Sequence, residues 1–265
     1  MGSMASDTVG DAAQGSYFDM LARIGVTKHF GDVRVTDMLA RRCGIDADSQ
    51  VLEVGCGVGN TASHLARTYG CHVMAVDLSH GMTVHTQAEA LRHQVHQLIN
   101  LGVADAQTLP FVSGYFDVVL VESVSGFLAD QPLGFREYAR VLGPGDYLGF
   151  TEPTWLAPPT AQAENFVATL GTKPLSADNW VALMQQAGFE ELDVHLHTVD
   201  VTQEAQGCLS QYGCRGVLRA AFKMLPLLIK SAHTRKLVHR ATASVSERVY
   251  EVLGYGLYLG RKPEA

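Results

Sequence analysis

The chain has 265 residues and a net charge of −7, with 47% hydrophobic and 18% charged residues, a composition typical of a globular protein rather than a disordered one. Because binding to a nucleic-acid backbone depends on a broad basic surface, the acidic balance argues against nucleic acid as a partner. No apolar run approaches the roughly 20 residues that span a bilayer, and the N-terminus lacks the basic and apolar segments of a secretory signal, so we expect a cytoplasmic protein.

The cysteines and histidines give no ligand pattern. Five cysteines are odd in number and include no C-x-x-C pair, and the eleven histidines lack accompanying carboxylates or cysteines at ligand spacing. We therefore expect reduced thiols and no metal site.

We expect one domain over residues 16–265, preceded by a flexible N-terminus at 1–15 in which Met1-Gly2-Ser3 resembles a tag remnant. Within this domain, residues 16–45 are predicted to form an N-terminal helical cap or lid, and residues 205–250 a helical insertion before the last strand.

Hydrophobic periodicity predicts helices and strands that alternate from residue 32 to residue 151. The predicted helices in this part cover 32–44, 60–69, 80–96 and 132–142, and the strands cover 50–54, 71–76, 98–103, 117–121 and 147–151. Further on, we expect helices at 160–170, 176–187 and within 205–250, with strands at 192–201 and 255–260. Alternation of this kind predicts an α/β fold with a doubly wound parallel sheet.

A glycine-rich loop follows the first predicted strand, in the stretch Val-Leu-Glu-Val-Gly-Cys-Gly-Val-Gly-Asn at 51–60. Ligands of such sheets bind at the carboxyl ends of the strands, where glycines let the backbone approach closely. A dinucleotide-binding loop would carry a small residue at position 60, where Asn60 stands, and Glu53 would repel a pyrophosphate. The loop therefore favours a cationic ligand over NAD, although an NAD-dependent oxidoreductase stays as an alternative.

This acid-x-Gly-x-Gly-x-Gly stretch resembles motif I of the class I S-adenosylmethionine-dependent methyltransferases. Leu109-Pro110-Phe111, followed by Phe116-Asp117-Val118-Val119, is similar to a run found in the type 11 small-molecule enzymes of that class. The resemblance covers roughly residues 35–155. It implies a seven-stranded Rossmann-like sheet and S-adenosyl-L-methionine as the cofactor.

The resemblance also implies which residues bind the cofactor. Asp77 corresponds to the family's acid that accepts the ribose hydroxyls, Met82 lies where a methionine often stands beside the adenine, and Asp105-Ala106 resembles the adenine-binding segment. The full expected set is Glu53, Gly55, Cys56, Gly57, Gly59, Asn60, Asp77, Leu78, Met82, Asp105, Ala106 and Glu122. Cys56 is interpreted as a packing residue rather than a nucleophile, and Asn60 also as a cap of the following helix.

The acceptor is harder to predict, because methyl transfer mainly needs alignment of donor and acceptor, and a base only where the acceptor carries a proton. His29 and Tyr17, from the N-terminal segment, and Glu122, at the end of a strand, are the candidate catalytic residues. For His29 a packed or solvated role stays open, and for Glu122 a supporting structural one. Motifs of base-methylating enzymes are absent, so we expect a small, partly apolar molecule as the O-, N-, S- or C-acceptor.

The predicted insertion at 205–250 is strongly basic, with eight Lys or Arg against one Glu, a local charge of +7 that leaves −14 for the rest of the chain. Three interpretations stay open: a lid over an apolar acceptor pocket, a packing or dimerisation element, and a peripheral contact with anionic membrane. Correspondingly, the alternatives to a small-molecule enzyme are a non-catalytic S-adenosylmethionine-binding protein with a basic partner or membrane module, and a lipid-modifying methyltransferase. The sequence does not indicate an oligomeric state.

Overall fold

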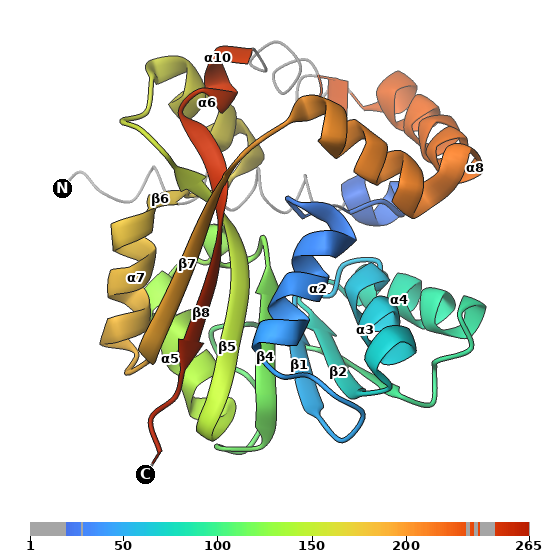
Figure 1. Cartoon of the computed structure of the whole chain (residues 1–265). Helices are drawn as coiled ribbons and strands as arrows, with labels where there is room; N and C mark the ends of the chain where they lie inside the picture. The colour runs from blue at the N-terminus through green and yellow to red at the C-terminus, as the bar shows by residue number, and fades with distance from the viewer. Residues whose placement is uncertain (1–19, 28, 232–233, 236–237, 239–246, 265) are drawn as a thin grey trace, which may run out of the picture.

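A single mixed sheet organises the protein in the computed structural model, which describes residues 20–27, 29–231, 234–235, 238 and 247–264 (Figure 1). The strands are β1 Gln50–Val54, β2 His72–Asp77, β3 Ile99–Val103, β4 Phe116–Glu122, β5 Leu142–Trp155, β6 Leu175–Ser176, β7 Glu190–Thr198 and β8 Leu253–Arg261. Their order is β3-β2-β1-β4-β5-β8-β7, with the short β6 beside β5. All pairings are parallel except those of β8, which runs antiparallel to β5 and β7. The predicted α/β fold with a seven-stranded Rossmann-like sheet is confirmed.

Helices cover both faces of this sheet. They are α2 Asp32–Arg42, α3 Asn60–Tyr69, α4 His80–Arg92, α5 Gln131–Val141, α6 Ala161–Leu170, α7 Ala177–Gln186, α8 Val201–Lys230 and α10 Glu247–Tyr250, with a 3-10 turn η1 at Ser125–Phe127. In Figure 1, α2, α3 and α4 lie on one side of the strands and α5 and α7 on the other, while α8 passes over the top of the sheet. No helix in these described ranges is long and apolar enough to cross a membrane.

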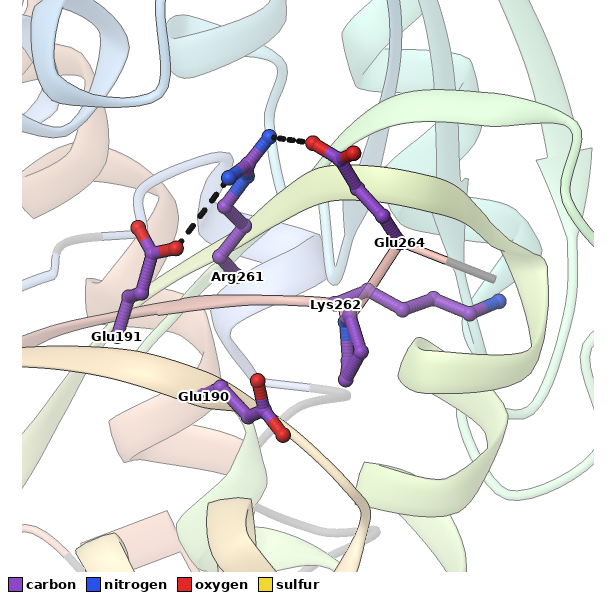
Figure 2. Close-up of a pocket in the computed structure, with 6 residues that line it drawn as sticks. Glu190, Glu191, Arg261, Lys262 and Glu264 are labelled. Atoms are coloured by element: carbon purple, nitrogen blue, oxygen red, sulfur yellow. Dashed lines mark hydrogen bonds and ion pairs between the residues drawn. The ribbon is translucent and has the colours of Figure 1, made fainter.

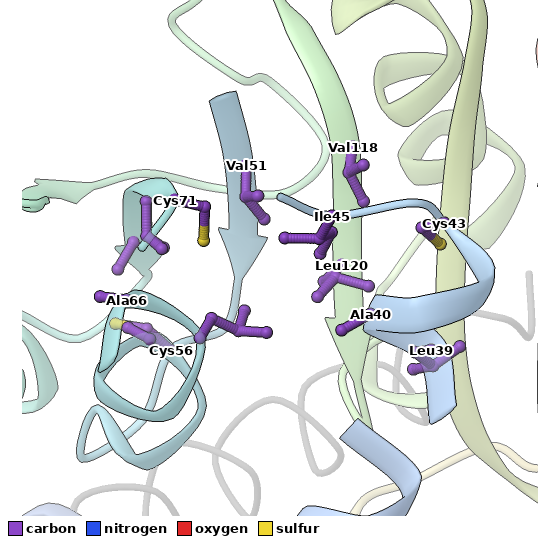
Figure 3. Close-up of a cluster of buried hydrophobic side chains, with 14 of the residues drawn as sticks. Leu39, Ala40, Cys43, Ile45, Val51, Cys56, Ala66, Cys71, Val118 and Leu120 are labelled. Atoms are coloured by element: carbon purple, nitrogen blue, oxygen red, sulfur yellow. The ribbon is translucent and has the colours of Figure 1, made fainter. Parts of the chain in front are cut away.

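The core has one large apolar layer on each face of the sheet, and a smaller third cluster lies between α6, α10 and the start of β8. Figure 3 shows the α2 side, where Leu39 and Ala40 point toward Leu120 of β4. On the other side, Trp180 of α7 packs with Phe150 of β5, and both are fully buried. Strands buried on both faces read as continuous apolar runs, as the β4 sequence does, which explains why the sheet was predictable from the sequence.

Several boundaries differ from the prediction for local reasons. Strand β5 begins at Leu142 rather than 147, because residues Gly143-Pro144-Gly145, which were predicted to form a turn, belong to the strand. Helix α4 ends at Arg92 instead of reaching 96, and Gln94 has a left-handed φ of 59° just beyond it. Helix α8 begins earlier than expected and has a non-helical residue inside it, Gly213, with φ 63° and ψ 169°.

The two flanking segments of the predicted domain are described in part. Residues 1–19, including the candidate Tyr17, lie outside the described residues, as do parts of the 205–250 insertion. Within the predicted cap at 16–45, α2 packs directly on the sheet through Leu39 and Ala40, so this part of the cap belongs to the core.

Candidate functional site

Three carboxylates come from the carboxyl ends of neighbouring strands. Asp77 is the last residue of β2 and Glu122 the last of β4, while Glu53 lies one residue before the end of β1, which pairs with both. Since parallel strands end at the same edge of the sheet, their side chains converge there. The structure thus brings together three acids that are far apart in the sequence.

The glycine loop is held tightly over the end of β2. The backbone N–H groups of Gly55 and Cys56 both donate to the carbonyl of Val76, at 2.8 and 2.9 Å. Gly59 has a φ of 85°, and a Cβ added to it would lie 2.6 Å from the Cα of Thr86 in α4. Only glycine fits such a left-handed position against a neighbouring backbone. The loop therefore exposes backbone without side chains at the edge of the sheet where Glu53, Asp77 and Glu122 converge.

Asp77 fastens this loop to β2. Its carboxylate accepts the backbone N–H of Gly57 at 2.9 Å and that of Ser79 at 2.8 Å. Burial raises the pKa of Asp77, and these two backbone N–H donors oppose the rise. The side chain is fixed in place before any ligand arrives.

Glu53 is a buried acid in an acidic surrounding. It is 5% exposed, and its Oε2 atom has no hydrogen-bond partner among the described residues. Burial raises the pKa of Glu53 well above its ordinary value, and the nearby charges of Glu122 and Asp77 raise it further. A cationic ligand at this edge would offset the repulsion, whereas a pyrophosphate would increase it.

Glu122 is held by hydroxyl groups from two helices. It accepts from Thr61 Oγ1 of α3 at 2.7 Å and from Thr36 Oγ1 of α2 at 2.9 Å. His29 lies beside it, with Nδ1 at 3.6 Å from Glu122 Oε1 and 3.1 Å from the carbonyl oxygen of Phe30. Two of the three candidate catalytic residues are therefore neighbours, and the two threonines that fix Glu122 were not predicted.

Tyr212 of α8 reaches into the same region and was also missed. Its phenol donates to the carbonyl of Thr27 and accepts from the backbone N–H of Thr27 and the side-chain amide of Asn60, the latter two at 3.0 Å. Thr27 in turn accepts the N–H of Val58 in the glycine loop, at 3.3 Å. The first part of α8 is thus tied both to the N-terminal segment and to the loop.

One interpretation of Asn60 was wrong. The N-cap of α3 is Gly59, which has a left-handed backbone and makes no side-chain capping bond, so Asn60 is not the cap. The Asn60 amide donates to Tyr212 instead. Asn60 therefore bonds to Tyr212, which is 152 residues away in the sequence, and not to the backbone of its own helix.

The remaining residues of the expected cofactor set lie in different environments. Leu78 follows β2 and is 73% exposed, whereas Met82 in α4 is buried. Asp105 accepts both the backbone N–H and the side-chain amide of Gln107, at 2.8 and 3.2 Å, next to the buried Ala106. Cys56 is buried in the core, where burial raises the pKa of its thiol, so that it stays protonated and packs as an apolar group. Their contacts with a cofactor stay predictions.

Comparison with known proteins identifies the family. A family model described as a methyltransferase domain matches residues 52–150, which run from β1 into β5 and contain the glycine loop, Asp77 and Glu122. A protein of Haemophilus influenzae named only as uncharacterized is 33% identical over 197 residues, which are 72% of this chain and 75% of that protein. The chain belongs to the class I S-adenosylmethionine-dependent methyltransferases.

A relative named as a methyltransferase and the fold agree with this assignment. Methyltransferase GfsG of Streptomyces halstedii is 29% identical over 178 residues, 65% of this chain and 63% of GfsG. The crystal structure of the [4+2]-cyclase SpnF superposes with a TM-score of 0.75 at 21% identity, covering 97% of this chain and 96% of that one. At this identity the last comparison concerns the fold alone.

The residues at the strand ends fit the family's cofactor. S-adenosylmethionine is an amino acid and a nucleoside joined through a sulfonium, so it combines two positive charges with ribose hydroxyls. The Glu53 oxygen that has no partner among the described residues suits the cationic part of the cofactor. The Asp77 carboxylate, already held in place by backbone N–H groups, suits the ribose hydroxyls. No group of three or more His, Cys, Asp or Glu that could hold a metal occurs within the part of the chain that the structure describes.

A separate hollow at the other edge of the sheet does not belong to this site. It lies beside the end of β8 (Figure 2). Its volume is about 220 Å³. Arg261 bridges Glu191 and Glu264 there, at 3.2 and 2.8 Å. Arg261 pairs with Tyr147 near the start of β5, so the hollow lies opposite the carboxyl ends of the parallel strands.

Proposed function

We propose that this protein transfers the methyl group of S-adenosylmethionine to a small, partly apolar molecule and releases S-adenosylhomocysteine. The observation that carries the proposal is the convergence of Glu53, Asp77 and Glu122 beside a backbone-lined glycine loop in a chain of the methyltransferase family. The cofactor supplies an electrophilic methyl group on its sulfonium. The protein holds, aligns and shields the reactants.

His29 is the proposed base for an acceptor that must lose a proton. Its Nδ1 lies within hydrogen-bond distance of the carbonyl of Phe30, so a proton on Nδ1 donates to that oxygen and leaves Nε2 with a free lone pair. Glu122, fixed by Thr36 and Thr61, stabilises the imidazolium once Nε2 has taken the acceptor's proton. Glu122 thus acts as a positioning residue behind His29.

Aromatic rings next to His29 support an acceptor with an apolar part. Phe30 stacks on Tyr255 of β8 with ring centroids 5.7 Å apart, and Tyr255 stacks on His197 of β7 at 5.0 Å. Beyond β4, Ser123 has a left-handed φ of 58°, an uncommon conformation for a residue other than glycine that is often found at functional sites. We assign the space between the end of β4 and these rings to the acceptor.

A protein that binds the cofactor without transferring its methyl group is the second candidate. The likeness of the fold to that of SpnF, which is named a cyclase, indicates that this architecture is not tied to one reaction. A lipid-modifying methyltransferase is a variant of the first proposal with a larger apolar acceptor.

Isothermal titration with S-adenosylhomocysteine, run beside NADH at the same concentrations, tests the cofactor assignment. We expect heat of binding from the first ligand alone, and binding of neither would contradict the proposal. Transfer of a labelled methyl group to panels of phenols, amines and lipid precursors then tests catalysis. Cofactor binding without transfer to any panel would favour the non-catalytic candidate.

A further inference from the structure

Beyond Gly213, helix α8 exposes a row of large apolar side chains. They are Leu218, Phe222, Leu225 and Ile229, which are 58%, 73%, 55% and 69% exposed. Their spacing of four, three and four residues places them on one side of a helix with about 3.6 residues per turn. A contiguous apolar face of this kind on a folded protein usually marks an interaction surface.

Basic residues border this row on one flank. Arg215 and Arg219 are exposed, and their positions in the helical repeat adjoin those of the apolar row. Residues 205–246 contain no Asp or Glu, so no acid of this segment balances these charges. We call the four apolar residues and these two basic residues the α8 face.

The α8 face points away from the body of the protein. Tyr212 ties the part of α8 before the break at Gly213 to Thr27 and Asn60. Beyond the break, Lys223 donates to the carbonyl of Ile24 at 3.4 Å, from a side of the helix that does not carry the apolar row. The row itself is exposed to solvent, so it faces outward.

We propose that the α8 face docks on an anionic lipid bilayer. An amphipathic helix with Leu, Phe and Ile on one side and Arg along its border lies in the interface of such a bilayer, the apolar side chains among the acyl chains and the cations at the headgroups. Self-association through the same face would bring two sets of uncompensated cations together, so charge complementarity favours anionic lipid over a second copy. The proposal does not depend on methyl transfer.

Vesicle co-sedimentation of the full chain tests it. We expect binding to vesicles of phosphatidylcholine with phosphatidylglycerol, weak binding to phosphatidylcholine alone, and weaker binding as salt is raised. The double variant Phe222→Glu/Ile229→Glu should lose at least about tenfold in affinity. Arg215→Gln/Arg219→Gln should lose about fivefold per side chain on anionic vesicles.

Val112→Glu is the matched control, because Val112 is 69% exposed, like Ile229, but lies outside α8. It should bind vesicles as the unmodified chain does. Titration with S-adenosylhomocysteine shows that each variant is folded, and it separates failure of this proposal from failure of the proposed function. The proposal is overturned if anionic vesicles do not sediment the protein, if the α8 variants bind as well as Val112→Glu, or if sedimentation equilibrium shows a dimer that these variants dissociate.

Discussion

The Oδ2 atom of Asp77 accepts the backbone N–H of Gly57 at 2.9 Å, which ties the end of β2 to the middle of the glycine loop. The acid that the family resemblance assigns to the ribose therefore also fixes the loop that surrounds the ligand. Binding and local structure are coupled at this one side chain, so a substitution there tests both.

Asp77→Asn should weaken S-adenosylhomocysteine binding while leaving the protein folded. The amide keeps one oxygen for a backbone N–H but loses the charge that strengthens hydrogen bonds to hydroxyls, so we expect a loss of roughly 1.5 to 3 kcal/mol in binding free energy. Isothermal titration measures it. Asp46→Asn is the control, since Asp46 likewise accepts the N–H two residues on, that of Asp48, but lies before β1, outside the proposed site. Equal affinities for the two variants would sink the ribose assignment.

Gly59→Ala should unfold the loop region more severely than Gly44→Ala does. Both glycines have a left-handed φ, 85° and 70°, so both variants bear the roughly 1 to 2 kcal/mol cost of that conformation for an L-residue. A Cβ at Gly44 meets nothing within 4 Å, whereas at Gly59 it meets the Thr86 backbone at 2.6 Å. We expect an additional loss of roughly 1 to 3 kcal/mol in the free energy of unfolding, measured by urea denaturation. Similar losses for the two variants would contradict the close packing of the loop on α4.

The sequence was informative where structure depends on neighbours in the chain. Periodicity predicted nearly every strand, and the Glu53-to-Asn60 spacing predicted the loop, because both follow from local backbone requirements. The bond from Tyr212 to Thr27 spans 185 residues and joins a predicted insertion to a predicted cap, so no local pattern could indicate it. Thr36 and Thr61 were missed for the same reason, since each becomes a partner of Glu122 only after α2 and α3 pack on the sheet.

Tyr212→Phe should loosen α8 over the site without disturbing the core. The substitution keeps the ring and removes hydrogen bonds to Thr27 and Asn60, each worth about 1 kcal/mol in net stability. We expect faster proteolysis within α8 and faster release of S-adenosylhomocysteine, measured by limited digestion and stopped-flow displacement. Tyr115→Phe, at an exposed tyrosine far from α8 in the sequence, is the matched control. An unchanged digestion rate would contradict a restraining role for the Tyr212 phenol.

Glu152 is a second buried acid, and it lies beneath the turn that follows β4. It is fully buried, and its carboxyl group accepts the N–H groups of Val124 at 2.8 Å, Gly126 at 3.2 Å and Ser125. Burial raises the pKa of Glu152 to about 8, with the three N–H donors opposing the rise. This side chain therefore supports η1, next to the proposed acceptor space, and its protonation state links the stability of that region to pH.

Glu152→Gln should remove a pH-dependent part of the stability. The folded-state pKa of about 8 lies above the ordinary value of 4.5, so the stabilisation that the proton provides is complete below about 4.5 and is lost as pH rises through about 8. Within that window the free energy of unfolding of the unmodified chain should fall relative to Glu152→Gln by up to about 1.4 kcal/mol per pH unit. Urea denaturation of both proteins across this window measures the difference, and Glu53, which is common to both, cancels. A difference that stays constant with pH would show that Glu152 is ionised in the folded protein, with the three backbone donors outweighing its burial.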